Sequence, residues 1–298
     1  MIIENQKQVT DAVLEELQRA PNARFREIMS GLVRHLHDFA RDVRLTEEEF
    51  QQACAYINAI GQHTNARHNE AVLMAGSLGL SSLVCLLNNG NKGQTETAAN
   101  MLGPFWRLNS PRVENGGSIV FSPVPGPALF VKARVVDDAK RPIADAEVDV
   151  WQSSTEGFYD NQDPKLGGMN LRGKLTTDKE GRFSFRSILP AGYPIPINGP
   201  VGELLAAQGR HNMRPAHLHF LIFKQGFKTL ISQVYVKGAP WLDTDVQFGV
   251  TRALVGDYVQ HGADEQAPAP DVKGEWYSLD YTFGMEPGEA KLPRAPIQ

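Results

Sequence analysis

Two histidines, His217 and His219, lie one residue apart in the segment "RPAHLHFLIF". Side chains at positions i and i+2 of a strand point to the same face, so the two imidazoles would lie about 7 Å apart along it. Burying two imidazoles among apolar residues costs free energy unless each finds a partner. A metal ion supplies such a partner, and a pair of hydrogen-bonded structural histidines is the alternative. The spacing by itself leaves both interpretations open.

Two tyrosines in turn-rich segments bear on the kind of metal. Tyr159 lies in "STEGFYDN" and Tyr193 in "LPAGYPIPING". A phenol has an ordinary pKa of about 10, so it becomes a good ligand only beside a strongly Lewis-acidic ion such as iron(III). A zinc hydrolase would instead need a third histidine, a cysteine or a carboxylate, together with an open position for water. For each tyrosine, a packed aromatic with a hydrated hydroxyl is the alternative.

Composition and charge exclude several classes of function. The chain has 298 residues, of which 42% are hydrophobic, and a formal net charge of -4. It has no basic stripe, which gives no electrostatic reason to expect nucleic-acid binding. No stretch approaches the ~18 uninterrupted apolar residues of a membrane span. Cys54 and Cys85 lie among apolar neighbours, which predicts buried, reduced thiols. These features predict a soluble protein of the cytoplasm.

The first hundred residues show the periodicity of helices. Apolar side chains recur at spacings of three and four over residues 25–39, which makes one apolar helix face. Thr46 and Glu49 form the Thr-x-x-Glu pattern of a capping box, which predicts the start of a helix. Residues 65–89 are apolar on most sides and rich in small side chains. We therefore expect one buried helix in that last segment, with Asn65 as its cap.

The pattern changes near residue 118 to that of strands, beginning with "SIVFSPV". Short segments rich in Val, Ile and Phe are separated by turn clusters such as "DDAKRP" and "DKEGR". This arrangement is typical of an antiparallel sandwich rather than a parallel sheet. We expect a mixed α+β fold, with an all-helical domain at residues 1–103 followed by an antiparallel β-sandwich domain at residues 104–298.

Three motifs in this order, "GFYDN", "LPAGYPIP" and "RPAHLHF", resemble those of the intradiol ring-cleavage dioxygenases, in the branch of catechol and hydroxyquinol 1,2-dioxygenases. The similarity covers most of the chain. It includes "LGPFWR" at the position of the family's Gly-Pro loop, and the helical first third resembles the family's linker and dimerisation domain. The resemblance implies that the sandwich is the catalytic domain.

The resemblance also implies roles for particular residues. One iron(III) ion per chain would be held by four side chains: Tyr159, Tyr193, His217 and His219. The catalytic residues would be Arg214, as a cation beside the metal, Gln233, beside the substrate, and Tyr193, as the ligand that the substrate displaces.

The implied activity is cleavage of the aromatic ring of a catechol-type substrate with O2, between the two hydroxylated carbons. The product is a dicarboxylate of the muconate or maleylacetate type. "LGPF" and "YPIPI" resemble the hydroxyquinol (benzene-1,2,4-triol) branch most, with catechol or a substituted catechol as the alternative. The substrate pocket would be lined by Leu73, Gly76, Met101, Leu102, Gly103, Pro104, Phe105, Ile195, Pro196 and Ile197.

One of these positions departs from the hydroxyquinol branch, whose members tend to carry an aspartate where Gly76 stands. Glycine offers no acceptor for a third hydroxyl group, and it would leave extra volume. We therefore expect a pocket that also accepts a bulkier or less polar ring substituent.

The helical third would expose apolar faces that a monomer covers poorly. The resemblance implies a homodimer through this domain, with a phospholipid-like molecule at its interface. Two alternatives to the dioxygenase remain open from the residues alone. A zinc hydrolase on a β-sandwich would be colourless, and a non-catalytic, transthyretin-like binding module would hold no metal and simply pack both tyrosines. Phenolate bound to iron(III) would instead make the protein red.

Overall fold

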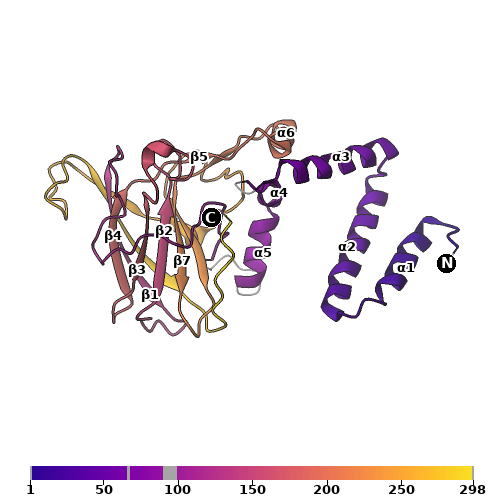
Figure 1. Cartoon of the computed structure of the whole chain (residues 1–298), viewed down its shortest axis with the longest axis horizontal. Coiled ribbons are helices and arrows are strands. Elements are labelled where there is room, and N and C mark those ends of the chain that lie inside the picture. Colours follow the sequence, from indigo (N-terminus) through magenta and orange to yellow (C-terminus); the bar gives the residue numbers. More distant parts are fainter. Residues whose placement is uncertain (1, 66–67, 90–98, 297–298) are drawn as a thin grey trace. The chain divides into compact units, whose positions relative to one another are not determined.

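The structure is a computed structural model of the chain, and it describes residues 2–65, 68–89 and 99–296. The chain forms two compact units, Met1–Ala59 and Ile60–Gln298, which divide within a helix. The first unit is helical, and the second holds further helices and all the strands, so the predicted mixed α+β fold is confirmed (Figure 1).

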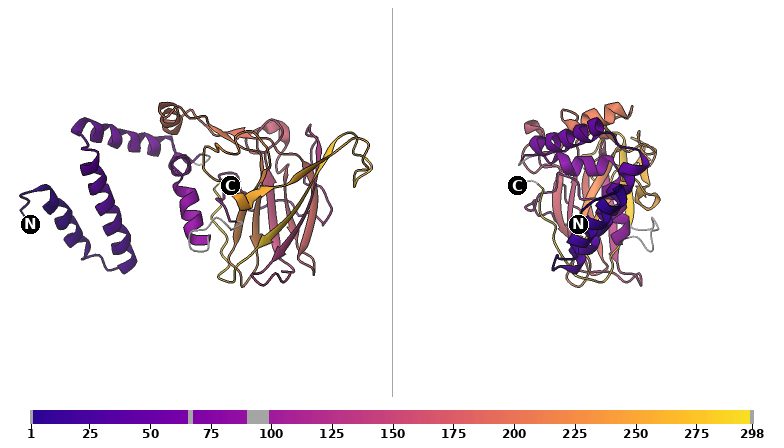
Figure 2. Two further views of the ribbon diagram at one scale, coloured as in Figure 1. Left: turned by 180° about the vertical axis from the view of Figure 1, so that it is seen from behind. Right: turned by 90° about the vertical axis from the view of Figure 1, so that its right-hand side faces the viewer.

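The first unit contains α1 (Gln6–Leu17), α2 (Ala23–Asp42) and most of α3 (Glu47–His63). Helices α1 and α2 run side by side (Figure 2), joined by a contact of 2.8 Å between the Thr10 hydroxyl and Nδ1 of His37. The predicted capping box is confirmed, since the Thr46 N–H donates to Glu49 Oε2 at 2.8 Å and the Glu49 N–H donates to Thr46 Oγ1 at 3.2 Å. The apolar face of α2 is exposed in the single chain, with Leu36 and Phe39 each 54% accessible.

The prediction of one buried helix over residues 65–89 is wrong. Two helices form, α4 (Glu70–Ser77) and α5 (Leu80–Asn89), with a bend of 76° between them. Gly79 has a φ of +74°, a left-handed conformation that ends a helix and suits glycine. Asn69, rather than Asn65, caps α4 by accepting from the Val72 N–H.

Several side chains of this segment are exposed. Leu87, on α5, is 68% accessible. Among the described residues no single helix is long and apolar enough to cross a membrane; the bent pair α4 and α5 would be, by length and composition alone. The prediction of buried thiols is also wrong, because Cys54 is exposed and Cys85 is half-buried.

The strands of the second unit form a sandwich of two main sheets (Figures 1 and 2). The five-stranded sheet has the order β3 (Arg172–Thr176), β2 (Glu147–Gln152), β7 (His217–Phe223), β8 (Leu230–Val236) and β9 (Val255–Gly256). The four-stranded sheet has the order β10 (Tyr258–His261), β11 (Trp276–Gly284), β1 (Ala128–Val136) and β4 (Arg182–Ile188). The remaining elements are η2 (Pro164–Leu166), β5 (Tyr193–Pro194), α6 (Pro200–Ala207), β6 (Met213–Arg214) and η3 (Arg252–Leu254).

The two main sheets are mixed, which corrects the expectation of purely antiparallel strands. Strand β1 pairs in parallel with β11, and β8 pairs in parallel with β9. In both cases a long chain segment separates the partners, so a tight antiparallel hairpin is not required. Turn signals predict the local hairpins, whereas these partners are selected by packing of the whole sandwich.

The core of the sandwich lies between the two sheets and is rich in aromatic rings. Phe220 of β7 packs against Phe283 of β11 with ring centroids 4.8 Å apart, and against Phe183 of β4 at 6.2 Å. The predicted strand at residues 118–124 does not form, apart from an isolated bridge at Ser118. There the backbone N–H groups of residues 121 and 122 donate to the side chain of Asn170, which replaces a neighbouring strand.

Candidate active site

The centre of the five-stranded sheet holds His217 and His219. Both belong to β7, which lies between β2 and β8, and both are buried, with 1% and 0% of their surface accessible. Their shared face confirms the spacing argument, since the two Nε2 atoms lie 3.0 Å apart. The indole of Trp151, opposite His219 on β2, stacks on that imidazole at 4.7 Å. The strand and its neighbours therefore hold both rings rigidly.

Both imidazoles are neutral and offer lone pairs. His217 Nδ1 donates to the Pro215 carbonyl at 2.7 Å, so in the neutral ring Nε2 carries the lone pair. Burial and then the charge of Arg214 lower the pKa of His217 to about 3. Burial, the neighbouring His217 and Arg214 hold the pKa of His219 well below its ordinary value. His219 Nδ1 is one of the buried polar atoms, in the part of the chain that the structure describes, without a hydrogen-bond partner.

Tyr159 reaches these histidines from the loop after β2. Its hydroxyl lies 3.0 Å from His219 Nε2, and its side chain is fully buried. The next residue, Asp160, anchors the loop: its buried carboxylate accepts from the Arg172 guanidinium at 2.8 Å and from Arg107 at 3.1 Å. These charge-assisted hydrogen bonds fix the direction in which the tyrosine points.

Tyr193 enters from the short strand β5. It pairs directly with Arg214 of β6, so the two-stranded ribbon sets these two residues against each other. The Tyr193 ring is perpendicular to that of Tyr159, with centroids 5.3 Å apart, and lies 5.5 Å from the His217 ring. Burial, together with Tyr193, raises the pKa of Tyr159 well above its ordinary value. A cation among the four side chains would reverse that shift.

These four side chains fit a metal ion. Two neutral Nε2 atoms face each other at 3.0 Å, and the Tyr159 hydroxyl lies at the same distance from one of them. Donor atoms about 2.1 Å from a common ion and at right angles around it would be ~3 Å apart. Two phenols and two imidazoles, with at least three donors converging in a buried place, suit a hard, strongly Lewis-acidic cation.

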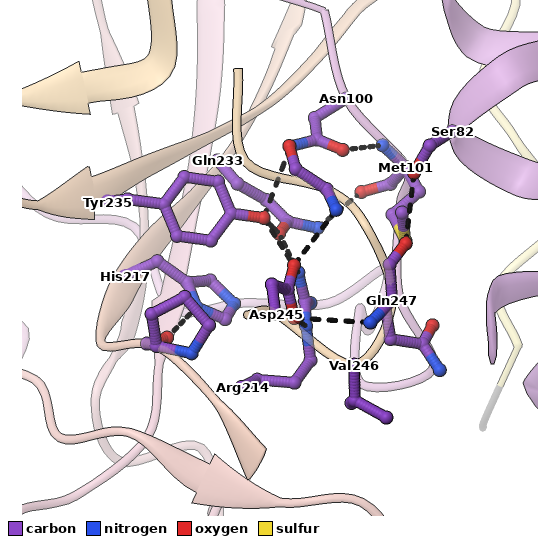
Figure 3. A network of polar contacts seen from close by, with 12 residues as sticks. Ser82, Asn100, Met101, Arg214, His217, Gln233, Tyr235, Asp245, Val246 and Gln247 are labelled. Carbon is purple, nitrogen blue, oxygen red and sulfur yellow. Dashed lines mark hydrogen bonds and ion pairs between the residues drawn. The ribbon is translucent and has the colours of Figure 1, made fainter. Parts of the chain in front are cut away.

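Arg214 lies beside this group at the centre of a buried polar network (Figure 3). Its Nε and Nη2 atoms each donate to the Asp245 carboxylate at 3.1 Å, and Nη2 also donates to Tyr235 at 2.6 Å and to Gln233 at 3.0 Å. Burial lowers the pKa of Arg214, but Asp245, Tyr235 and Tyr193 together outweigh burial and raise that pKa well above its ordinary value. The guanidinium is therefore a permanent positive charge held at one position.

The sequence reasoning found Arg214 and Gln233 but missed Tyr235 and Asp245. Tyr235 could have been predicted from the sequence, because it follows Gln233 by two residues on β8 and so lies on the same face of the strand. Asp245 gave no such signal, since it lies in an irregular segment. Burial raises the pKa of its carboxyl, but Arg214 and the backbone N–H groups of residues 247 and 249 lower it below the ordinary value overall.

The predicted pocket residues divide into three groups. Met101, Gly103 and Phe105 adjoin the four-residue centre: the Met101 carbonyl accepts from Gln233 at 2.7 Å, and the Phe105 ring stacks on Tyr159 at 4.3 Å. Gly103 has a φ of +73°, and a Cβ there would lie 3.2 Å from His219 Cε1. Only glycine suits both the backbone and this close approach.

The second group packs in an apolar cluster at α4 and α6. Ile195 is buried there and Leu73 packs against it, together with Val246. The third group differs: Pro104, Pro196 and Ile197 are exposed in the single chain. Leu102 belongs to the first group, because it packs on the aromatic cluster that contains both tyrosines. The ten residues predicted to line one pocket therefore differ widely in burial.

The extra volume expected at Gly76 is taken up by another side chain. A Cβ at Gly76 would lie 2.1 Å from Gln247 Oε1, so the Gln247 amide occupies that space. Gln247 is 8% accessible, and its backbone N–H donates to Asp245, the partner of Arg214 (Figure 3). A polar amide from a distant segment therefore fills the space that was expected to be open at Gly76.

Asp149 is a buried acid that contacts Trp106 of the aromatic cluster, and it predicts how stability depends on pH. Burial raises the pKa of Asp149 to about 6, despite Lys174 and a 3.3 Å hydrogen bond from Trp106 Nε1. The folded protein then binds this proton more tightly than the unfolded chain. The carboxylate destabilises the fold above pH 6, and that penalty is lost as the pH falls toward 4.

We therefore expect Asp149→Asn to raise the free energy of unfolding by roughly 2–3 kcal/mol at pH 8 and by little at pH 4. Denaturant unfolding at several pH values measures this difference. A gain of the same size at both pH values would show that the Asp149 carboxyl is not the cause.

Comparisons with known proteins show the family of the chain. Residues 104–283 match the family model described as dioxygenase, and residues 22–96 match the model for the catechol dioxygenase N terminus. A 6-chlorohydroxyquinol 1,2-dioxygenase of Cupriavidus pinatubonensis is 41% identical over 95% of this chain and 98% of its own. A catechol 1,2-dioxygenase of Candida albicans is 36% identical over 93% of this chain and 91% of its own.

Solved structures show the same likeness. The crystal structure of a hydroxyquinol 1,2-dioxygenase from Pseudomonas putida DLL-E4 superposes with a TM-score of 0.86, at 36% identity, over 95% of this chain and 99% of that one. The family models and the relatives show that the chain is an aromatic-ring dioxygenase. The chain belongs to the intradiol ring-cleavage dioxygenase family.

Proposed function

We propose that this chain is a non-haem iron(III) dioxygenase that cleaves a catechol-type ring between its two hydroxylated carbons. Hydroxyquinol is the favoured substrate, and catechol or a substituted catechol is the alternative. The observation that carries the proposal is the convergence of two neutral, buried imidazoles with two buried phenols. One iron(III) per chain would be held by His217, His219, Tyr159 and Tyr193.

When bound, ferric iron supplies a Lewis acid that acidifies the substrate hydroxyls and draws electron density from the ring. The chain's own residues then have separate tasks. Tyr193, one of the residues that would hold the ion, would accept one substrate proton at its phenolate oxygen. Arg214 places a fixed positive charge beside the reacting carbon, and the buried surroundings exclude water that would screen it. Gln233 positions Arg214 through their 3.0 Å hydrogen bond.

The preference for hydroxyquinol draws support from two sources. The relatives described above include a 6-chlorohydroxyquinol and a hydroxyquinol 1,2-dioxygenase. In addition, the Gln247 amide beside Gly76 carries both a donor and an acceptor for a hydroxyl group on the ring. We assign Gln247 as the polar contact for the third substituent, in place of the aspartate of the hydroxyquinol branch.

The direct test is oxygen uptake by the iron-loaded protein with hydroxyquinol, catechol and chlorohydroxyquinol as substrates. We expect a red protein, uptake of one O2 per substrate, and both atoms of 18O2 in the dicarboxylate product. The highest kcat/KM should be with a hydroxyquinol. Oxygen uptake without ring cleavage, or a colourless iron-loaded protein, would contradict the proposal. A higher kcat/KM with catechol would reverse the order of substrates only.

Replacing the displaced tyrosine separates binding of the metal from entry of the substrate. We expect Tyr193→Phe to retain iron, because three ligands remain, but to show an altered visible spectrum and roughly 10²-fold slower substrate binding, as expected for loss of one acid–base group. Stopped-flow mixing without oxygen measures that binding step. Normal binding kinetics would assign the displaced ligand to Tyr159 instead.

A paired substitution tests the contact between Gly76 and Gln247. Gly76→Ala places a Cβ 2.1 Å from the Gln247 amide oxygen, so the amide must move. We expect Gly76→Ala to raise the KM for hydroxyquinol about tenfold. Adding Gln247→Ala to the same chain should remove the clash, so the effect of the double variant should differ from the sum of the two single effects by ~1 kcal/mol or more. Gly284→Ala, where a Cβ meets nothing within 4 Å, is the control. Additive effects of the two changes would argue against the contact.

We further propose that residues 1–103 form the dimerisation domain and residues 104–298 the catalytic domain. The exposed apolar side chains of α2, among them Leu36 and Phe39, support a homodimer. A phospholipid-like molecule at that interface would cover apolar surface that remains. Light scattering on the purified protein measures the mass, and lipid extraction with mass spectrometry identifies any bound lipid.

A further inference from the structure

A second group of potential metal ligands lies outside the four-residue centre. His63 ends α3, His68 follows in the connection to α4, and Glu70 begins α4. One ligand atom from each residue lies within 4.8 Å of the others. The His63 and His68 rings are perpendicular, with centroids 5.3 Å apart, and Nε2 of His68 contacts Oε2 of Glu70. Two imidazoles and a carboxylate are a common ligand set for zinc.

The carboxylate of this group is deeply buried. Glu70 is 1% accessible, whereas His63 and His68 are half-buried, so an ion could enter from their side. A carboxylate in such a place costs free energy unless its charge is compensated. Its Oε1 atom accepts from the Val201 N–H at 2.8 Å, at the first turn of α6, and its Oε2 atom is left for His68 or an ion.

The surrounding backbone brings the three ligands together. Residues 65 and 68 exchange backbone hydrogen bonds of 2.8 and 3.3 Å, which hold His68 near the end of α3. The Glu70 N–H donates to Thr64 Oγ1 at 3.1 Å. Gly199, just before α6, leaves the space in which they meet: a Cβ there would lie 2.6 Å from Glu70 Oε1 and 2.7 Å from His63 Nε2.

We propose that His63, His68 and Glu70 form a second metal site, which binds a divalent cation of the zinc class. Ligand distances of about 2.1 Å require the three donor atoms to approach to ~3.3 Å, which rotation of the half-buried His63 ring allows. Water would complete the coordination. The ion would join His63 and Glu70 beside the first turn of α6. Helices α4 and α6 adjoin in the second unit (Figure 1).

This site goes beyond the proposed ring cleavage and does not depend on it. Its function is structural: it would brace α4, which carries Leu73 and Gly76 of the proposed pocket. Metal binding adds its free energy to that of folding, because the unfolded chain lacks the arranged ligands. Zinc should therefore raise the thermal midpoint of the protein by several degrees.

The test is zinc binding to the tag-free, iron-loaded protein, with zinc and iron measured together by equilibrium dialysis and elemental analysis. We expect one zinc per chain with no loss of iron, and at least 100-fold weaker binding in His63→Ala and His68→Ala. Gly199→Ala should also lose zinc, although it removes no ligand, because its Cβ fills the space. His35→Ala, which removes an exposed histidine of α2, should bind zinc normally.

Three results would overturn the second site. These are zinc uptake that occurs only as iron is lost, equal zinc binding by wild type and His63→Ala, and a thermal midpoint unchanged by zinc. Because neither ring cleavage nor colour is used as the readout, failure of this proposal leaves the proposed function intact.

Discussion

We expect Arg214→Met to retain its iron and its colour but to lose roughly 10²–10³-fold in kcat, as when one charge-stabilising donor is removed from an active site. Arg214 is 3% accessible and lies next to Tyr193 in the ribbon formed by β5 and β6. Its positive charge acts in surroundings from which water is excluded, so charge that develops on the ring is stabilised strongly. Steady-state oxygen uptake and iron analysis on the same sample measure both quantities.

The structure adds a complication that the sequence did not indicate. Removing Arg214 leaves the Asp245 carboxylate buried without its partner, and loss of one member of a buried ion pair costs about 3–5 kcal/mol of stability. The double variant Arg214→Met, Asp245→Asn removes both charges. It should regain most of the stability while its turnover stays low.

The double variant therefore separates catalysis from folding. If turnover recovers together with stability, the role of Arg214 is to hold the fold. If turnover stays low in a stable, iron-loaded protein, its charge acts on the reaction. Asp245→Asn alone should keep substantial activity, since it leaves the guanidinium in contact with Gln233 and Tyr235.

His219→Ala should abolish iron binding and colour, and with them all detectable turnover. The imidazole lies between two other proposed ligands, 3.0 Å from His217 Nε2 and 3.0 Å from the Tyr159 hydroxyl. Removing it leaves a gap at the centre of the ligand set rather than at its edge. Truncating a metal's own ligand costs more than the 10–100-fold in metal affinity that outer partners contribute.

The matched control is His211→Ala, six residues before His217. His211 is exposed, and its Nε2 atom contacts Thr244 Oγ1 at 2.9 Å. Iron content and the visible spectrum of that variant should equal those of the wild type. Full iron loading in His219→Ala would contradict the proposed ligand set.

Some of the centre was predictable because it is local. The spacing of His217 and His219 places them on one face of any strand, and burial among apolar residues follows from the same segment. The capping box at Thr46 is likewise a contact between near neighbours in the chain, and the structure contains it. Tyr159 and Tyr193 lie in turn-rich segments that left their role open, and only the resemblance of their motifs to a known family implied that they are ligands.

Two of the wrong predictions failed because a local preference was overridden. Residues 118–124 have the composition of a strand, but the Asn170 side chain takes the backbone hydrogen bonds that a neighbouring strand would take. The helix expected over residues 65–89 breaks at Gly79. In each case a contact or a single backbone conformation overrode a preference that is weak in free energy.

The sequence by itself determined the helical and sandwich halves, the histidine pair and, through its motifs, the family. The tertiary structure decided what surrounds the centre: Asp245 on Arg214, Gln247 in the space beside Gly76, and the approach of His63 to Glu70 and Gly199. Side-chain periodicity is a property of consecutive residues, so it can be read directly from the chain. The contacts of Gln247 with Gly76 and of His63 with Gly199 join segments more than a hundred residues apart, and that of Asp245 with Arg214 spans 31 residues. Such contacts depend on how the sheets and helices pack, and no local pattern encodes them.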